Sequence, residues 1–343
     1  MDNFFIHFVL CNITIGLFVL ILLCMKRIFK HCLTPRMQFN LWIPFTISLL
    51  VPFLPVSFST LSTKMQDLFH PLAHFSHAVH TTNTSEYTSS STNQIYDYAI
   101  SMRTQFPVYI STIFCVIWGI GMFVMLFSFV RSLVLLHHMR RTANLMQDKR
   151  IHAIYMTCLS ELQLRKSIPL YSSSIIDTPV STGILRPAIF LPLHRISNFE
   201  EQEIRYILLH ELMHCYYKDA IFNYCMNIIR ILYWFHPLIW LITKEFYTER
   251  ELACDTSVLR LLGANEQISY GVTLLHFVDK QTNTPLSLLN NLSENAKQMK
   301  RRILNIKQHQ PLTIQKKLHS ILSFLLSLLV ILCGTPWLLS LIH

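Results

Sequence analysis

Two histidines and a glutamate stand at a spacing that suits a zinc peptidase. The stretch I-L-L-H-E-L-M-H-C contains His210, Glu211 and His214 in the pattern H-E-x-x-H. Residues i and i+4 of a helix lie on one face, so both imidazoles can meet one metal ion. Glu211 lies one residue further round the helix, where it can take a proton from the attacking water. The pattern predicts a catalytic Zn2+ site with His210 and His214 as ligands and Glu211 as general base.

A catalytic zinc ion takes three protein ligands and keeps a fourth position open, so one more donor must come from elsewhere. The segment T-E-R-E-L-A-C-D places Glu251 and Asp255 four residues apart on a second predicted helix. We expect Glu251 to be the third ligand, and Asp255 to accept the free N–H of a zinc-bound histidine. Glu245 and Glu249 are rival ligands, and each is equally typical of an exposed charge.

The nine cysteines are scattered, and none forms a C-x-x-C pair. This pattern does not suggest a disulfide framework. Cys215 and Cys254 adjoin the proposed ligands, and helix geometry predicts that both point away from the ion and pack in the core.

The composition indicates a membrane protein. Of 343 residues, 52% are hydrophobic and only 14% are charged, whereas a soluble domain carries about a quarter charged residues. The formal net charge is +10, but the basic residues crowd against the ends of apolar runs. That placement fits membrane topology better than direct binding of nucleic acid.

The apolar runs predict four membrane-spanning helices. We expect two spans with a basic loop in residues 1–58, a polar outside loop at 59–105, a third span at 106–136, a cytosolic domain at 137–317, and a fourth span at 318–343. Basic residues follow the first and third spans and precede the fourth, which places these segments in the cytoplasm. The N-terminus and the C-terminus then lie outside the cell membrane.

Residues 220–243 are apolar enough to suggest a further span. A full crossing would separate Glu251 from the two histidines. Arg230 and His236 would also be costly at the middle of a bilayer. We therefore expect a membrane-dipping hairpin that bends near His236 and Pro237, and a buried helix of the soluble domain is an equal alternative.

Several motifs together resemble those of one family. They are H-E-L-M-H at 210–214 with Asp219 and Asn223, W-F-H-P-L-I-W at 234–240, E-L-A-C-D at 251–255, and T-P-V-S-T-G-I-L-R-P-A-I-F-L-P at 178–192. The chain resembles, over essentially its whole length, the membrane zinc peptidases of the BlaR/MecR type, which are antirepressors of inducible β-lactam resistance.

The resemblance implies an α-helical integral membrane protein with a cytosolic α+β gluzincin-like metallopeptidase domain. It implies zinc held by His210, His214 and Glu251, with Asp219 and Asn223 nearby. It also implies that the enzyme cleaves itself and promotes loss of a cytosolic transcriptional repressor. The best-known members carry a penicillin-binding domain after the fourth span, whereas this sequence ends at His343 and has no S-x-x-K motif. We therefore expect an external signal to act on the 59–105 loop, on the spans, or through a partner, which is a second copy in a homodimer or a separate sensor protein.

A short strand is predicted near the site. Ile189, Phe190 and Leu191 lie between Pro187 and Pro192, and proline confines a strand to the edge of a sheet. Peptidases of this type bind the substrate backbone along such an edge. An ordinary structural hairpin is the alternative.

Two other functions remain open at this point. One is a non-catalytic signalling scaffold with a structural zinc site, for which Glu211 would have no use. The other is a housekeeping membrane protease of the prenyl-protein or heat-shock type, which the four-span layout and the W-F-H-P motif disfavour. The basic tract 297–303 has the charge to contact nucleic acid or a repressor, but it is more typical of a helix that is solvated or faces lipid headgroups before a span.

Overall fold

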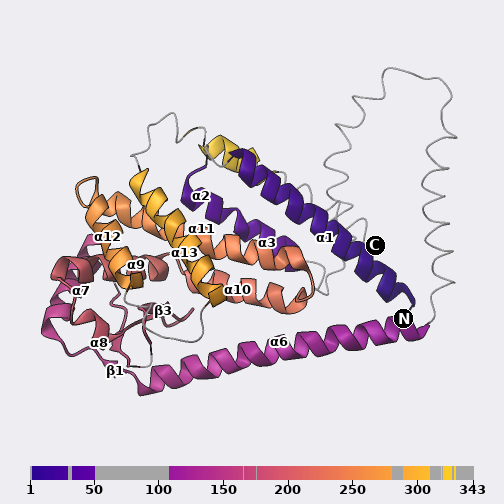
Figure 1. Cartoon of the computed structure of the whole chain (residues 1–343), viewed down its shortest axis with the longest axis horizontal. Helices are drawn as coiled ribbons and strands as arrows, with labels where there is room; N and C mark the ends of the chain where they lie inside the picture. The colour runs from indigo at the N-terminus through magenta and orange to yellow at the C-terminus, as the bar shows by residue number, and fades with distance from the viewer. Residues whose placement is uncertain are drawn as a thin grey trace.

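The computed structural model describes residues 2–29, 33–50, 108–164, 166–174, 176–279, 289–309, 318, 320–326, 328 and 329. The predicted loop at 59–105, the end of the second predicted span and most of the fourth lie outside the described residues. The described chain is mainly helical and contains one small four-stranded sheet (Figure 1).

The first three helices are α1 (Asp2–Ile28), α2 (Pro35–Asn40) and α3 (Trp42–Leu50). The hydroxyl of Thr34 accepts a hydrogen bond from the Met37 amide and so caps α2, which begins at a proline. The helices share one buried core with α10 and α11, made of residues that include Ile15, Phe18, Trp42, Phe45, Met226, Ile229 and Phe246. The N-terminal segment therefore packs against the helices that carry the predicted site.

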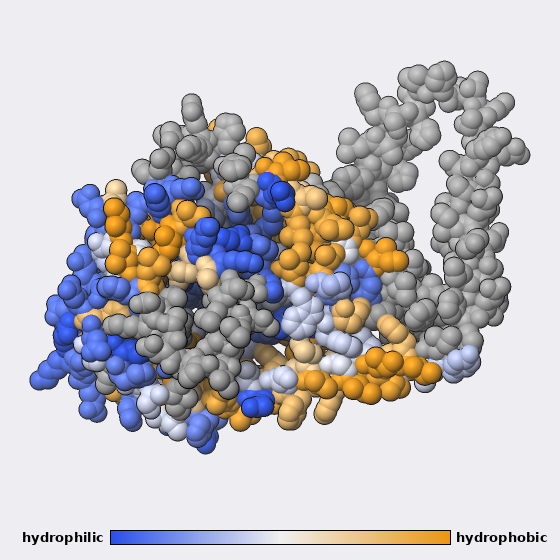
Figure 2. Space-filling model, viewed as in Figure 1, coloured by the Kyte–Doolittle hydropathy of each residue, from blue (hydrophilic) through white to orange (hydrophobic). Residues whose placement is uncertain are grey.

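Helix α6 (Val108–Thr142) runs along one side of the molecule (Figure 1). Its stretch Thr112–Thr142 is long and apolar enough to cross a membrane, and it is the one such helix found among the described residues. Apolar side chains gather on the surface over α6 and α1 (Figure 2). At its end, Arg140 donates hydrogen bonds to the carbonyls of Thr182 (2.9 Å) and Arg186 (3.1 Å). These bonds tie α6 to the sheet.

The sheet contains β1 (Asn144–Leu145), β2 (Leu170–Ser172), β3 (Val180–Thr182) and β4 (Ala188–Leu191) in the order β1-β2-β4-β3. Strand β4 pairs in parallel with β2 and antiparallel with β3. It is therefore central, and the prediction that Ile189, Phe190 and Leu191 form an edge strand is wrong. Pro187 and Pro192 flank the strand without interrupting it, so every residue of β4 keeps its N–H for the ladder. The edge strands of this sheet are β1 and β3.

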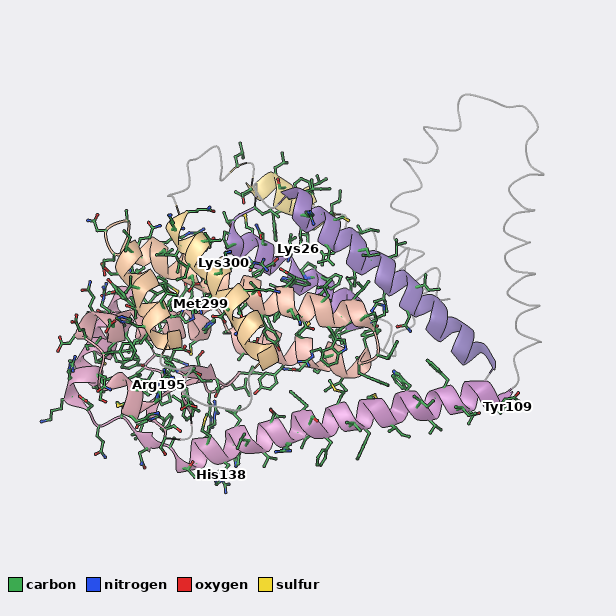
Figure 3. The ribbon with its side chains drawn as sticks, in the orientation of Figure 1. Lys26, Tyr109, His138, Arg195, Met299 and Lys300 are labelled. Carbon is green, nitrogen blue, oxygen red and sulfur yellow. The ribbon has the colours of Figure 1, made fainter. Side chains whose placement is uncertain are left out.

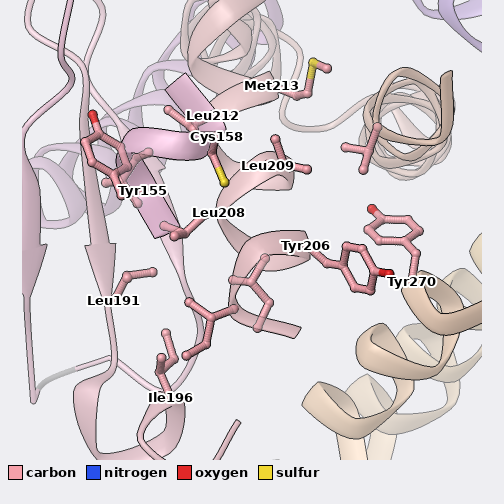
Figure 4. Close-up of a cluster of buried hydrophobic side chains, with 14 of the residues drawn as sticks. Tyr155, Cys158, Leu191, Ile196, Tyr206, Leu208, Leu209, Leu212, Met213 and Tyr270 are labelled. Carbon is pink, nitrogen blue, oxygen red and sulfur yellow. The ribbon is translucent and has the colours of Figure 1, made fainter. Parts of the chain in front are cut away.

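The remaining helices surround α9 (Glu201–Tyr216). They are α7 (Lys149–Glu161), α8 (Leu193–Ile196), α10 (Asp219–Leu232), α11 (Pro237–Leu262), α12 (Gln267–Asp279) and α13 (Leu289–Lys307). A capping box between Glu200 and Glu203 starts α9. Leu208, Leu209 and Leu212 of α9 are fully buried in a cluster that also includes side chains of α7 and α12 (Figure 4). This core holds α9 in place.

Residues 220–243 fold as two helices with a break between them. Helix α10 ends at Leu232, and α11 begins at Pro237, which occupies the first turn where no amide partner is required. Entry of this pair into a bilayer stays a prediction.

Candidate active site

Helix α9 brings the two histidines together. The Nε2 atoms of His210 and His214 are 3.2 Å apart, and their rings stand perpendicular. His210 and Glu211 are both buried, at 7% and 8% exposure. The spacing of four residues therefore places both ring nitrogens at one point, as the sequence predicts.

Helix α11 brings Glu251 to the same point. Its Oε2 lies 3.3 Å from His210 Nε2, and its Oε1 lies 3.8 Å from His214 Nε2. Arg250 Nη2 donates to Glu251 Oε1 at 2.6 Å. Burial by itself would raise the pKa of the Glu251 carboxyl, but the charge of Arg250 and the contact with His210 hold that pKa well below its usual range. An ionised carboxylate thus faces both imidazoles.

This donor set fits zinc. Ligand atoms about 2.0–2.1 Å from a tetrahedral zinc ion lie about 3.3 Å from one another, and the 3.2 Å and 3.3 Å separations agree with that value. Two imidazole nitrogens that face each other without a hydrogen between them repel, and a shared cation removes the repulsion. His210, His214 and Glu251 are therefore suited to hold one ion.

His214 is supported from the adjoining turn. Its Nδ1 is 2.7 Å from Asp219 Oδ2, which assigns the ring proton to Nδ1 and leaves Nε2 free. Lys218 adopts a left-handed conformation with φ of 55°, and this turn brings Asp219 at the start of α10 back to the histidine. Arg36 of α2 lies 3.9 Å from the other oxygen of Asp219, so an N-terminal helix reaches the site.

His210 is supported from three other helices. Its Nδ1 is 3.0 Å from the hydroxyl of Tyr270 and 3.3 Å from Asp255 Oδ1. Tyr270 in turn donates to Asp255 at 2.7 Å, so Asp255 reaches His210 both directly and through this tyrosine. Arg302 makes two hydrogen bonds to Asp255, at 2.8 Å and 2.7 Å.

The Asp255 carboxylate is ionised in this setting. Burial would raise the pKa of Asp255, but the charge and hydrogen bonds of Arg302 hold it well below its usual range. Sequence reasoning missed both Tyr270 and Arg302. Arg302 belongs to the basic tract 297–303, in which Met299 packs against the core and Lys300 is exposed (Figure 3). Part of that tract therefore serves the site, and the prediction that it faces lipid headgroups does not hold for Arg302.

Asn223 contributes indirectly. Its Oδ1 accepts a hydrogen bond from Arg250 Nη1 at 2.6 Å, and Arg250 also binds Glu251. Asn223 thus reaches the proposed ligand Glu251 through Arg250. The role of Arg250 had no signal in the spacing of the motifs.

The rival carboxylates have other partners. Glu245 binds Arg301 at 2.9 Å. Glu249 accepts from Trp42 Nε1 at 2.7 Å and pairs with Lys26 at the end of α1 (Figure 3). Both are therefore engaged elsewhere, and of the three candidate ligands Glu251 is the carboxylate near the Nε2 atoms of the two histidines.

Cys254 is closer than the helix geometry predicts. Its Sγ lies 3.5 Å from His210 Nδ1, and His210, His214 and Cys254 offer ligand atoms within 4.8 Å of one another. The sulfur contacts His210 at its Nδ1 atom and also interacts with His214, whereas the carboxylate of Glu251 reaches the Nε2 atoms of both histidines. We therefore favour Glu251 as the third ligand.

A cavity of about 490 Å³ opens at the site. Its walls include His210, Glu211, His214, Glu251 and the edge strand β3. The amide of Ile189 donates to Pro169, toward β2, so alternation along the strands directs the backbone N–H and C=O of Ser181 away from β4, to the free edge. Ile189, Phe190 and Leu191 are fully buried and do not line this cavity.

Comparison with known proteins places the chain in a family. Residues 6–306 match the family described as BlaR1 peptidase M56. The regulatory protein BlaR1 of Bacillus licheniformis is 30% identical over 340 residues, which cover 98% of this chain and 56% of that protein. A methicillin resistance mecR1 protein of Staphylococcus aureus is 26% identical over 253 residues, covering 70% and 40% of the two chains.

The regulatory protein BlaR1 of Staphylococcus aureus is 24% identical over 305 residues, which cover 84% of this chain and 48% of that protein. The chain spans about half the length of the curated relatives it matches. Because the family match extends over most of the sequence, from the first helix to α13, the chain belongs to the BlaR1 peptidase M56 family.

Proposed function

We propose that this chain is a membrane-anchored zinc endopeptidase, with Zn2+ held by His210, His214 and Glu251. The observation that supports this most directly is the convergence of two Nε2 atoms and a carboxylate within 3.8 Å of one another. Glu211, which lines the cavity beside them, is the proposed general base.

Zinc, when bound, supplies a Lewis acid that polarises the substrate carbonyl. Glu211 takes a proton from the attacking water and delivers it to the leaving amine. Asp219 and the pair Tyr270 and Asp255 keep the protons of the two imidazoles on Nδ1, so that Nε2 stays available. The free edge of β3 offers the Ser181 amide and carbonyl to an extended substrate backbone.

The names of the relatives, a regulatory protein and a methicillin resistance protein, support a role in signal transduction. We propose that the chain cleaves itself and, directly or indirectly, a cytosolic transcriptional repressor. The apolar helix α6 supports an anchor in the cell membrane. Within that proposal the chain has four spans, a gluzincin-type peptidase domain in the cytoplasm and an extracellular C-terminus. Its partners are membrane lipid, its protein substrate, and either a second copy or a separate sensor protein.

The test compares the purified full chain with its Glu211→Gln variant in detergent after zinc loading. Mass spectrometry of the chain's own fragments, with zinc content measured in parallel, should show fragments from the wild type only and equal zinc in both. Glu201→Gln is the matched control, because Glu201 lies on the same helix in a surface pair with Arg150, and it should cleave as the wild type does. Fragments that persist in Glu211→Gln would contradict the proposal. Zinc without any Glu211-dependent cleavage would favour the non-catalytic scaffold.

A further inference from the structure

A second cavity adjoins the candidate active site. It has a volume of about 460 Å³ and lies between α6 and α10. Residues 180–183, Ala220 and Asn223 line both this cavity and that of the active site. A polypeptide that lies between β3 and the start of α10 would therefore pass from one cavity into the other.

The walls of this α6–α10 cleft carry two polar stripes. Ser128 and Ser132 lie four residues apart on α6, whose other residues in the wall of the cleft are apolar. Asn223, Asn227 and Arg230 follow at helical spacing on α10. Residues at this spacing share a helix face, so hydroxyls line one wall of the cleft and amides line the other. Such groups satisfy the N–H and C=O groups of an extended backbone, which an apolar wall leaves unpaired.

Contacts between the helices maintain the cleft. The rings of Phe129 and Tyr224 meet edge to face at 6.1 Å, and Trp234 Nε1 donates to the Trp118 carbonyl at 3.3 Å. Gly121 lies so close to Trp234 that a Cβ atom there would collide with the indole. Helix α6 thus rests against the turn after α10 at one end and is bound to the sheet by Arg140 at the other.

Arg230 is the charged group of the cleft. Its guanidinium stacks over the Trp240 ring at 4.6 Å, and its Nε is buried without a hydrogen-bond partner. Within the described part of the chain, no carboxylate forms an ion pair with it. A carboxylate at this point would give the guanidinium a charged hydrogen-bond partner. The cleft therefore suits a polypeptide that brings a carboxylate to this point.

We propose that the α6–α10 cleft receives the substrate on one side of the scissile bond, and that Arg230 selects an aspartate or glutamate there. The inference rests on the proposed peptidase function. Asp219 at the start of α10 contacts the ligand His214, and Arg230 lies about 16 Å further along the helix at 1.5 Å per residue. An extended polypeptide covers that length in about five residues. The acidic residue therefore lies about five positions from the cut.

The test uses the zinc-loaded full chain in phosphatidylcholine vesicles. It is incubated with a peptide library made by tryptic digestion of a bacterial lysate, and mass spectrometry identifies the new termini. Aspartate and glutamate should be enriched about five positions from the cut, on one side. For a selected acidic peptide, Arg230→Gln should lower kcat/KM about tenfold, the loss expected for a charged hydrogen bond, and leave the peptide's neutral amide analogue unchanged. Arg230→Glu should shift the preference to lysine.

Arg131→Gln is the matched control, because Arg131 is an exposed arginine of α6 that does not line the cleft. It should retain the acidic preference, and equal zinc content in all variants verifies that they fold. Glu211-dependent cleavage with no acidic preference, or with a preference that Arg230→Gln leaves intact, would overturn this inference but not the proposed peptidase function. An Arg230 effect that is equal for all peptides and needs added phosphatidylglycerol would assign the cleft to lipid headgroups and also overturn it. Absence of Glu211-dependent cleavage would overturn the proposed function itself.

Discussion

The two histidines of the site are held in different ways. His214 is held by Asp219, which lies five positions later across a single left-handed turn. His210 is held by Tyr270 of α12, Asp255 of α11 and Arg302 of α13. One support is local and adjoins the cavity, and the other is a buried network that forms only when three helices pack. Metal affinity and folding are therefore expected to respond differently to changes on the two sides.

The largest effect is expected on the buried side. Arg302→Gln leaves Asp255 as a buried charge without its main partner, because the exposed fractions of the two side chains are only 12% and 0%. Loss of one partner of such a pair costs about 3–5 kcal/mol of unfolding free energy. The neighbouring Arg301→Gln removes a pair with Glu245 whose side chains are 40% and 35% exposed, and costs at most about 1 kcal/mol. Chemical denaturation in detergent measures both, and similar losses would contradict the assignment of Arg302 to the network.

The same pair gives a pH dependence. The pKa of Asp255 is lower in the folded chain than in the unfolded chain, where it is about 3.9. The stability that it contributes is therefore complete above about pH 4 and is lost as the pH falls toward the folded value. The wild type should lose stability in this acid range, and Arg302→Gln should lose less. Parallel acid profiles for the two proteins would show that Asp255 is not ionised.

A smaller effect is expected on the local side. Asp219→Asn removes the carboxylate that fixes the His214 tautomer, and loss of such a partner lowers metal affinity about 10–100-fold. Competition with a fluorescent zinc chelator measures the affinity. The unfolding free energy of the zinc-free protein should fall less than in Arg302→Gln. Unchanged zinc affinity would mean that Asp219 does not orient the ligand.

The smallest effect is expected for Tyr270→Phe. This change removes one hydroxyl, but Asp255 remains 3.3 Å from His210 Nδ1 and can accept its proton. Because Asp255 still keeps the His210 proton on Nδ1, zinc affinity should fall less than in Asp219→Asn. A larger fall would mean that Tyr270, rather than Asp255, is the essential support of His210.

The contrast also explains how much of the site could be predicted. His210, Glu211 and His214 share one helical turn and a half, so their meeting follows from helix geometry alone. The prediction that Glu251 is the third ligand needed only a second helix and a reason to prefer it over Glu245 and Glu249. Arg302 and Tyr270 gave no local signal, because their partners lie on other helices and the contacts depend on how α11, α12 and α13 pack.

The sheet shows a different limit. Two prolines around residues 188–191 predict an edge strand, but proline blocks pairing only where its own amide is needed. The prolines stand outside the strand, which is central and buried. The extent of the core was also not visible in the hydropathy pattern. Apolar runs such as 4–24 and 39–58 indicate spans, yet α1, α2 and α3 share buried side chains with α10 and α11.

The central claim is that Nε2 of His210, Nε2 of His214 and the Glu251 carboxylate hold one zinc ion. X-ray absorption spectroscopy of the zinc-loaded full chain tests it most directly, because sulfur and nitrogen or oxygen ligands are resolved by bond length. We expect a shell of nitrogen and oxygen at about 2.0–2.1 Å with no sulfur, and loss of one oxygen ligand in Glu251→Ala. A sulfur contribution at about 2.3 Å would make Cys254 the third ligand in place of Glu251.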